Sequence, residues 1–130
     1  MKYFILVICA VWLYGCEISG SNGPESEEVA SEALCKYWWY MNYTDFDNAT
    51  IKLQLHFSLD GKGREIISRS IFGQTDSREY EFTWYWVSDA YASICMKYGE
   101  NNVSYIEEIF ITDDVLTCFR EGNRLTFYGR

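Results

Sequence analysis

The chain has 130 residues, 19 acidic and 11 basic side chains, and a formal net charge of −8. This excess of acid argues against nucleic acid as a partner, because phosphate backbones are bound through Lys and Arg patches. The length suits one domain. Aromatic residues make up 18% of the chain, and proline occurs once, at Pro24. High aromatic content with almost no proline favours a well-paired β structure.

The first fifteen residues predict a secretory signal peptide. Lys2 supplies a positive start, and Tyr3–Leu13 is an uncharged, mostly apolar run. Its length of about eleven residues matches the apolar region of such signals. A membrane-spanning helix needs about 20 apolar residues. We therefore expect residues 1–15 to be removed and the mature chain to have no transmembrane helix.

The sequence Leu13-Tyr14-Gly15-Cys16 ends this signal and resembles the lipobox of bacterial lipoproteins. The resemblance implies that Cys16 is acylated and becomes the first residue of the mature chain. Each buried methylene of an acyl chain contributes about 0.8 kcal/mol, so two or three chains give a stable anchor. The expected location is the cell envelope, on the outer membrane, facing either the periplasm or the outside. The alternative is a secreted protein whose cleavage site lies near a cysteine.

Residues 16–33 are expected to form an acidic tether that ends in a short helix. The segment Glu17–Glu32 is rich in Gly, Ser and acidic residues, with little to bury. Such a composition is typical of an extended, charged linker. From Ser26 to Leu34 the spacing of apolar residues allows one or two helical turns, with Ser26 as the N-cap.

Residues 34–130 show the period of a sheet. The first predicted strand is the aromatic Lys36–Tyr43. The clearest alternation covers Ile51–Leu59, with apolar side chains at every second position, as in a half-buried antiparallel strand. The turn Asp60–Gly63 then leads into Arg64–Ile71, which predicts a hairpin.

The second half predicts further short strands after a loop at Gln74–Ser77. They are Tyr80–Trp86, Tyr91–Tyr98, Val103–Ile111, Val115–Phe119 and a last strand through Tyr128. About eight strands joined in sequence order by tight turns favour an all-β, up-and-down antiparallel barrel. Such a barrel has room for side chains or for one small ligand.

Four features of the domain resemble the small lipocalin-like lipoproteins of Gram-negative gut anaerobes. A tryptophan lies in the first strand, a Ser-Leu-Asp-Gly hairpin follows, a later strand ends in a tryptophan pair, and isoleucines precede the last turns. The residues are Trp38 or Trp39, Phe57–Gly63, Trp84 with Trp86, and Ile106, Ile109 and Ile111. The resemblance implies a lipocalin-like barrel on a lipid anchor. It implies no settled activity.

Aromatic side chains are the candidate ligand-binding residues. Tyr80, Phe82, Trp84 and Trp86 share one face of a predicted strand, and Trp39 lies in the first strand. Aromatic rings in a barrel mouth can stack on an apolar ligand or a sugar ring. The alternative is that they fill the core of the barrel.

Glu107 is a further candidate for ligand binding. In a regular strand it would point inward with Val103 and Tyr105, and a buried carboxylate needs a partner. However, Ile106 and Ile109 are three positions apart. This spacing suggests a β-bulge, which would place one of Glu107 and Glu108 outside.

No catalytic residue, metal site or cofactor is expected. Cys35, Cys95 and Cys118 are too widely spaced for a metal or redox motif. Buried free thiols are the simpler interpretation, with one disulfide as the alternative. His56, the single histidine, lies on the polar face of its strand and is expected at the surface. A Gly-x-Ser-x-Gly motif, typical of hydrolases, is not found.

The sequence therefore predicts a lipid-anchored envelope protein that binds a small apolar or aromatic ligand in a barrel without catalysis. It would contact the membrane through the acyl chains on Cys16. A lipoprotein with a filled core that acts on a partner protein is the alternative. A third hypothesis is a secreted eukaryotic lipocalin, because Asn42, Asn48 and Asn102 each begin a glycosylation pattern.

Overall fold

The computed structural model describes residues 26–87 and 89–130. A helix is followed by eight strands: α2 (Glu27–Cys35), β1 (Trp38–Thr44), β2 (Thr50–Phe57), β3 (Lys62–Ile71), β4 (Gln74–Trp86), β5 (Ile94–Gly99), β6 (Asn102–Thr112), β7 (Val115–Arg120) and β8 (Asn123–Gly129). The predicted signal peptide, Cys16 and the start of the predicted tether lie outside the described residues. Within the described ranges, no helix has the length and apolar character needed to cross a membrane.

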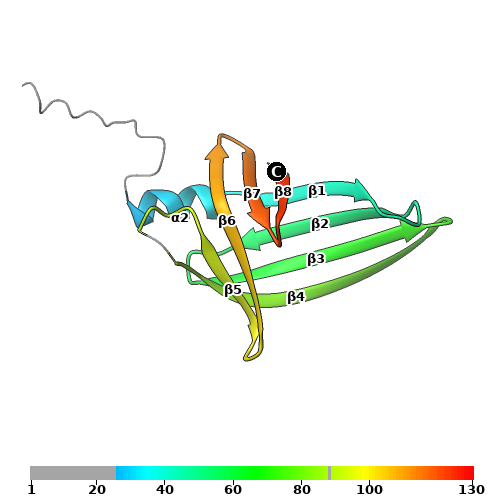
Figure 1. The fold of residues 1–130 in the computed structure, drawn as a ribbon, viewed down its shortest axis with the longest axis horizontal. Coiled ribbons are helices and arrows are strands. Elements are labelled where there is room, and N and C mark those ends of the chain that lie inside the picture. Colours follow the sequence, from blue (N-terminus) through cyan, green and yellow to red (C-terminus); the bar gives the residue numbers. More distant parts are fainter. Residues whose placement is uncertain (1–25, 88) are drawn as a thin grey trace, which may run out of the picture.

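The strands form a closed barrel in which each pairs antiparallel with the next (Figure 1). The barrel closes where β1 pairs with β8, at Trp39 opposite Gly129 and Tyr40 opposite Tyr128. Hairpin connections keep sequence neighbours adjacent, and closure leaves no free sheet edge at this seam. The predicted all-β, up-and-down barrel of eight strands with a short N-terminal helix is confirmed.

Helix α2 covers one end of the barrel. Its N-cap is Ser26, whose hydroxyl accepts a hydrogen bond from the backbone of the first turn, as expected. Leu34 is fully buried in the barrel core. The indole of Trp39 donates to the Leu34 carbonyl at 2.8 Å, and that of Trp86 donates to the Ser31 hydroxyl at 2.9 Å. The helix therefore acts as a plug at this end.

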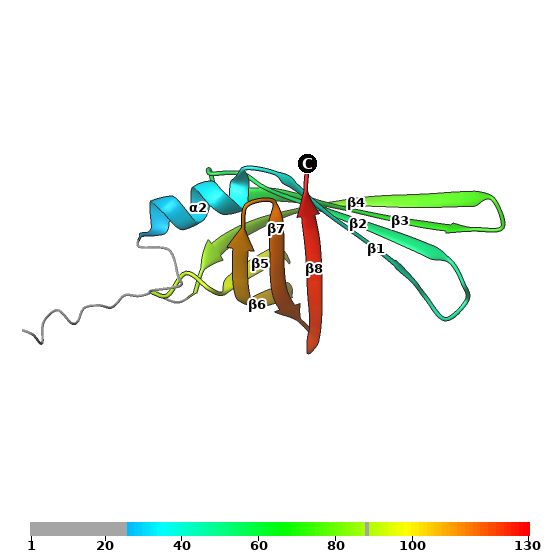
Figure 2. The same cartoon turned by 90° about the horizontal axis from the view of Figure 1, so that it is seen from above.

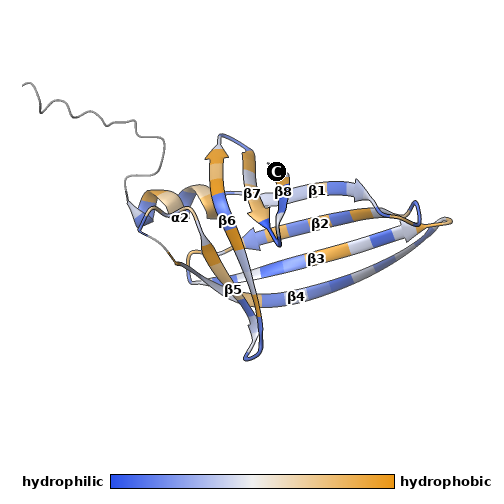
Figure 3. Cartoon of the chain, viewed as in Figure 1, coloured by the Kyte–Doolittle hydropathy of each residue, from blue (hydrophilic) through white to orange (hydrophobic). Residues whose placement is uncertain are grey.

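Strands β1–β4 continue beyond the barrel at the opposite end. β4 pairs with β5 only over Thr83–Trp86, whereas it pairs with β3 along almost its whole length. Residues 41–53 and 66–81 consequently extend away from α2 as a four-stranded ribbon, which we call the arm (Figures 1 and 2). Most of β4 is coloured hydrophilic in Figure 3, whereas apolar colours gather on α2, β5, β6 and β7.

The alternation predicted for the second strand is present. Ile51, Leu53, Leu55 and Phe57 are all buried, and they belong to the hydrophobic core. The strand ends at Phe57, however, and Leu59 is 66% exposed in the following turn. The prediction that Leu59 points inward was wrong, because the turn begins before it: the Ser58 N–H donates to the Lys62 carbonyl at 2.8 Å.

The predicted loop at Gln74–Ser77 was also wrong. These residues begin β4, and the chain reverses one step earlier, at Phe72 and Gly73. Both turn residues have positive φ, 53° and 76°, as a type I′ hairpin turn requires. The polar strand is stabilised by cross-strand hydroxyl pairs, such as the Ser70–Thr75 hydrogen bond of 2.8 Å.

Two other predicted strands start later than expected. Lys36 caps α2, so β1 begins at Trp38. β5 begins at Ile94, because Tyr91 has a φ of 53° and lies in the loop before it. A positive φ takes a residue out of the β region and ends the strand there.

Candidate functional site at the open end of the barrel

Two of the predicted ligand-binding aromatics lie in the barrel core. Phe82 is 4% exposed and Trp84 is 7% exposed. Both rings meet Phe57 edge-on, with centroids 5.5 Å and 5.7 Å away. The indole of Trp84 also donates to the Ser58 carbonyl at 3.1 Å. These rings fill the interior close to the end that α2 covers.

The remaining three aromatics lie in different surroundings. Trp39 is fully buried, and Tyr80 is 41% exposed beside Tyr98, with ring centroids 6.5 Å apart. Trp86 is half-buried against α2 and lines a cavity of about 280 Å³, together with Ala33 and Ile109. The five aromatics thus share no single cavity.

Glu107 lies on the exposed outer face of β6. The register of β6 against β7 shifts between Glu107 and Phe110, and Glu108 has a φ of 52°. The predicted β-bulge is therefore confirmed. Val103 and Tyr105 are exposed and Ile106 is buried, so the expectation that these two residues and Glu107 point inward was wrong: alternation from Ile106 already places Glu107 outside. The bulge that follows keeps Glu108 exposed as well. Neither carboxylate points into the barrel.

A cavity of about 480 Å³ lies at the open end of the barrel, away from α2; we call it the mouth. Its size falls in the range of small-molecule sites. Strands β1, β2, β3, β7 and β8 supply its walls. The apolar lining is Met41, Tyr43, Ile51, Leu53, Ile67 and Leu125, and the polar lining is Glu65, Arg120, Glu121 and Asn123. An apolar wall with a few polar groups is typical of a binding site for an amphiphilic molecule.

Four strands each contribute one side chain to a buried polar cluster at the mouth. Arg120 on β7 donates to the Glu65 carboxylate on β3 at 3.3 Å and to the Tyr98 hydroxyl on β5 at 2.9 Å. Its Nε donates to Ser104 on β6 at 3.1 Å. Tyr98 in turn donates to the same oxygen of Glu65, Oε1. The side chains of Glu65 and Arg120 are only 6% and 14% exposed.

The protonation states of this cluster follow from burial and from the neighbouring charges. Burial is the main cause that raises the pKa of Tyr98, so the phenol stays protonated and donates. Burial would lower the pKa of Arg120, but its interactions with the Glu65 carboxylate and with Tyr98, through charge and hydrogen bonds, together outweigh burial and raise the pKa. Both neighbours donate to Glu65, which suits an ionised carboxylate, a group that only accepts. The cluster is thus a paired anion and cation.

Charges farther out are acidic on balance. Glu121 lies at the rim of the mouth. On the arm, Arg69 donates to Asp45 at 3.0 Å and to Asp47 at 3.1 Å. Desolvation alone would raise the pKa of Asp45, but the hydrogen bonds from Arg69 and from backbone N–H groups, with the charge of Arg69, together lower it. The approach to the mouth therefore carries more negative than positive charge.

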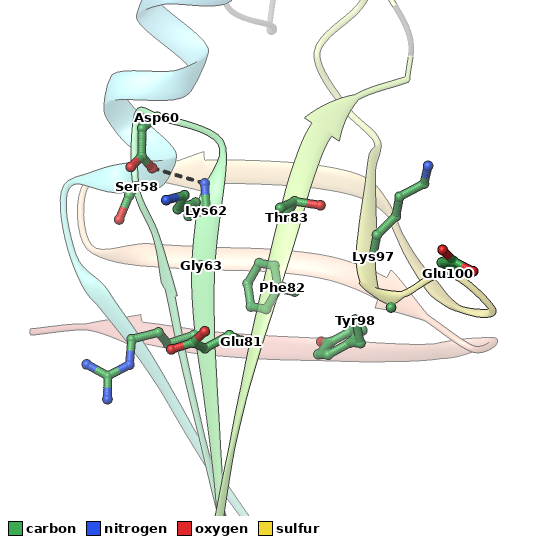
Figure 4. A pocket seen from close by; sticks show the side chains of 12 residues that line it. Ser58, Asp60, Lys62, Gly63, Glu81, Phe82, Thr83, Lys97, Tyr98 and Glu100 are labelled. Carbon is green, nitrogen blue, oxygen red and sulfur yellow. Dashed lines mark hydrogen bonds between the residues drawn. The ribbon is translucent and has the colours of Figure 1, made fainter.

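A second, more open cleft of about 760 Å³ lies at the side of the barrel. It lies where β4 and β5 stop pairing, beyond Thr83 and Lys97. Figure 4 shows the rings of Phe82 and Tyr98 next to each other in this gap, and their centroids are 5.3 Å apart. Charged side chains border it: Asp60, Lys62, Arg64, Glu81, Lys97 and Glu100. Tyr98 lines this side cleft, and its hydroxyl donates to Glu65, which lines the mouth.

The cysteines and the histidine take no part in the mouth. Cys35, Cys95 and Cys118 are free thiols, and the last two are buried, in agreement with the simpler expectation. Burial raises the pKa of Cys118 to about 11, which makes this thiol unreactive at neutral pH. His56 is half-buried and stacks on Trp38, with ring centroids 4.8 Å apart. Within the described ranges, no group of three or more His, Cys, Asp or Glu side chains could hold a metal ion.

Sequence reasoning missed the polar cluster. Glu65 follows Arg64 and precedes two isoleucines, so alternation within its own strand does not show whether its side chain points into the barrel or out of it. The signal was in the hairpin register: Glu65 lies opposite Leu55, and directly opposed residues share one face of a sheet. Because Leu55 was correctly predicted to point inward, pairing across the turn would have predicted an inward Glu65.

Comparison of the chain with protein-family models, with curated proteins and with solved structures finds no match in any of the three. The resemblance to lipocalin-like lipoproteins thus stays a prediction as far as ancestry is concerned. What the fold defines is a class of architecture, an eight-stranded up-and-down barrel with a plug at one end and a cavity at the other.

Proposed function

We propose that the protein binds a small, largely apolar molecule in the mouth of the barrel, without catalysis. The observation that carries this proposal is the mouth itself. Its apolar wall surrounds about 480 Å³ and ends on the buried pair Glu65 and Arg120. Burying an ion pair is costly, and a filled apolar core of the same shape is often at least as stable. A polar cluster retained beside a cavity is therefore typical of a binding site.

We also propose that the protein is anchored in the cell envelope through acyl chains on Cys16. The lipobox-like sequence supports this part of the proposal. The described chain starts at Ser26, beside the plugged end of the barrel, and the arm extends from the opposite end (Figures 1 and 2). Several residues of the arm line the mouth, among them Met41, Leu53 and Ile67. An anchor on Cys16 would thus leave the mouth free. Incorporation of labelled palmitate in the host cell, lost in a Cys16→Ser variant, tests the anchor.

Binding is tested with N-phenyl-1-naphthylamine, an uncharged aromatic probe whose fluorescence rises in apolar surroundings. Ile66 and Ile67 are neighbours on β3 with similar, partial exposure, and only Ile67 lines the mouth. Ile67→Gln should weaken probe binding about tenfold, because a polar amide replaces apolar wall. Ile66→Gln is the matched control and should leave binding unchanged. Equal effects of the two substitutions, or a probe signal that neither alters, would contradict a site in the mouth.

A second candidate function is docking to a partner protein through the end of the arm. Phe46 and Phe72 lie in the two loops that end the arm, and both side chains are almost fully exposed. Exposed aromatic residues are frequent anchors in protein interfaces. A photo-crosslinking residue at position 46 or 72 should then capture one defined protein in cells, and the same residue at position 59 should not.

A further inference from the structure

We propose that the ligand carries an uncharged head group that both donates and accepts hydrogen bonds, such as a hydroxyl or a primary amide, seated against Glu65 and Arg120. Its apolar part would be a single chain along the wall of Ile51, Leu53 and Ile67. This inference rests on the proposed function, and it selects one chemical class: neutral single-chain amphiphiles over fatty-acid anions and alkylammonium ions.

The charge balance of the mouth disfavours an anionic head group. Arg120 is the one cation among the residues that line the mouth, and Glu65 already pairs with it at 3.3 Å. A carboxylate placed there would share that guanidinium with Glu65, and two carboxylates close together repel each other. Glu121 at the rim adds a further negative charge. An anionic ligand would thus lose its water without gaining a counter-ion of its own.

A cationic head group gains little at the same place. The Glu65 carboxylate already accepts from Arg120 and Tyr98, so an ammonium group would lie beside the buried guanidinium. Glu121 remains as a partner, but it is exposed, and exposed ion pairs contribute about 1 kcal/mol or less. Desolvating an ammonium group costs more than this.

The hydrogen bonds of the cluster leave places for a neutral group. Both hydrogen bonds to Glu65 end on Oε1, and those of Arg120 start from Nε and Nη2. Among the described residues, no hydrogen bond reaches Oε2 of Glu65 or starts from Nη1 of Arg120. A carboxylate oxygen accepts and a guanidinium nitrogen donates. A hydroxyl group can donate to the carboxylate oxygen and accept from the guanidinium at the same time. An ester can only accept from the guanidinium.

The test compares four ligands with the same chain length: 1-decanol, methyl decanoate, decanoate and decylammonium. Each ligand is titrated against N-phenyl-1-naphthylamine bound to the full chain at neutral pH. Only the part of the probe fluorescence that Ile67→Gln removes is scored. Decanol should displace the probe at concentrations about tenfold below those of either ion. Methyl decanoate should fall in between, because it accepts but does not donate. This ranking requires no variant of the polar cluster.

The variant Glu65→Gln sharpens the test. Glutamine keeps the size of the side chain but removes its charge, so Arg120 loses its counter-ion. Decanoate should then bind more tightly than decanol, reversing the order seen with the unmodified chain. An unchanged order in a folded Glu65→Gln protein would overturn the inference, as would an ion that binds the unmodified chain as tightly as decanol.

The two proposals fail in different ways. If the probe gives no signal that depends on Ile67, binding in the mouth is contradicted and the inference falls with it. If the probe binds in the mouth and decanoate or decylammonium displaces it best, the inference is wrong and the proposed function stands. If none of the four ligands displaces a probe bound in the mouth, a single-chain amphiphile is excluded as the ligand.

Discussion

The guanidinium of Arg120 on β7 donates to the Glu65 carboxylate on β3 at 3.3 Å, across 55 positions of sequence. The pair lies inside a barrel whose other inward side chains are mostly apolar. It connects two strands that are not neighbours in the sheet.

The stability lost on removing Glu65 and the stability lost on removing Arg120 should not be additive. Glu65→Met or Arg120→Met alone leaves a buried charge without its counter-ion and should lower the free energy of unfolding by about 3 kcal/mol. The double variant should lose clearly less than the sum of the two single losses, because no unpaired charge remains. Urea unfolding of the four proteins measures the coupling. Additive losses would show that the two groups do not interact.

The Tyr98 hydroxyl should contribute a stability that is lost at alkaline pH. Burial raises its pKa above the ordinary value of 10. The unfolded chain therefore loses the proton first, so the contribution is complete below pH 10 and declines as pH rises through the folded-state pKa. At neutral pH, Tyr98→Phe should lose about 2 kcal/mol, because a hydrogen bond to a charged group is removed.

The difference in unfolding free energy between the two proteins should then shrink above pH 10. Urea unfolding across this pH range checks the sign. Tyr128→Phe is the control, since Tyr128 is 56% exposed. A difference that widens with pH would contradict the assigned protonation.

Phe72 should be replaceable with a gain in stability. Its φ of 53° is unfavourable for a bulky residue, and its side chain is 94% exposed. Asn tolerates this conformation and is preferred in type I′ turns, so Phe72→Asn should raise the free energy of unfolding by about 1 kcal/mol. Phe46→Asn is the control and should give no such gain. Thermal unfolding of both variants measures the change in stability. A loss of stability in Phe72→Asn would contradict the type I′ turn assigned to this position.

Trp84 should matter for folding and not for ligand contact. It is 7% exposed in the core, and Trp84→Ala should lower the free energy of unfolding by about 3 to 5 kcal/mol. Trp38→Ala should lower the free energy of unfolding far less, because Trp38 is only half-buried and stacks on His56. Chemical unfolding compares the two variants. Similar small losses would mean that Trp84 does not fill the core.

The fold was largely predictable because its signals are local. Each signal depends on residues within about ten positions of one another. Examples are the alternation over Ile51–Phe57, the hairpin at Asp60–Gly63 and the Ser26 cap. The turn at Phe72 was missed for a physical reason. A phenylalanine is an unexpected residue at positive φ, and the polar residues after it resemble a loop more than a strand.

The site was less predictable because it is assembled from distant strands. Glu65, Tyr98, Ser104 and Arg120 meet only when β3, β5, β6 and β7 close around one interior. Their neighbours in sequence follow no regular alternation: Ile66 follows Glu65, and Val103 and Tyr105 flank Ser104, so periodicity does not mark these polar side chains as inward. Of the aromatic residues that periodicity did mark, Trp39, Phe82 and Trp84 fill the core. Barrel register, which no local pattern contains, decides which polar side chain points inward.

Locating a bound ligand by NMR tests binding in the mouth most directly. Methyl signals of the full chain would be followed while N-phenyl-1-naphthylamine is added. If the ligand binds in the mouth, the largest shifts are expected at the methyl groups that line it, namely those of Met41, Ile51, Leu53, Ile67 and Leu125, with Ile66 unchanged. Saturable shifts confined instead to Ala33, Ile109 and Ile111, which line the small cavity beside α2, would contradict it.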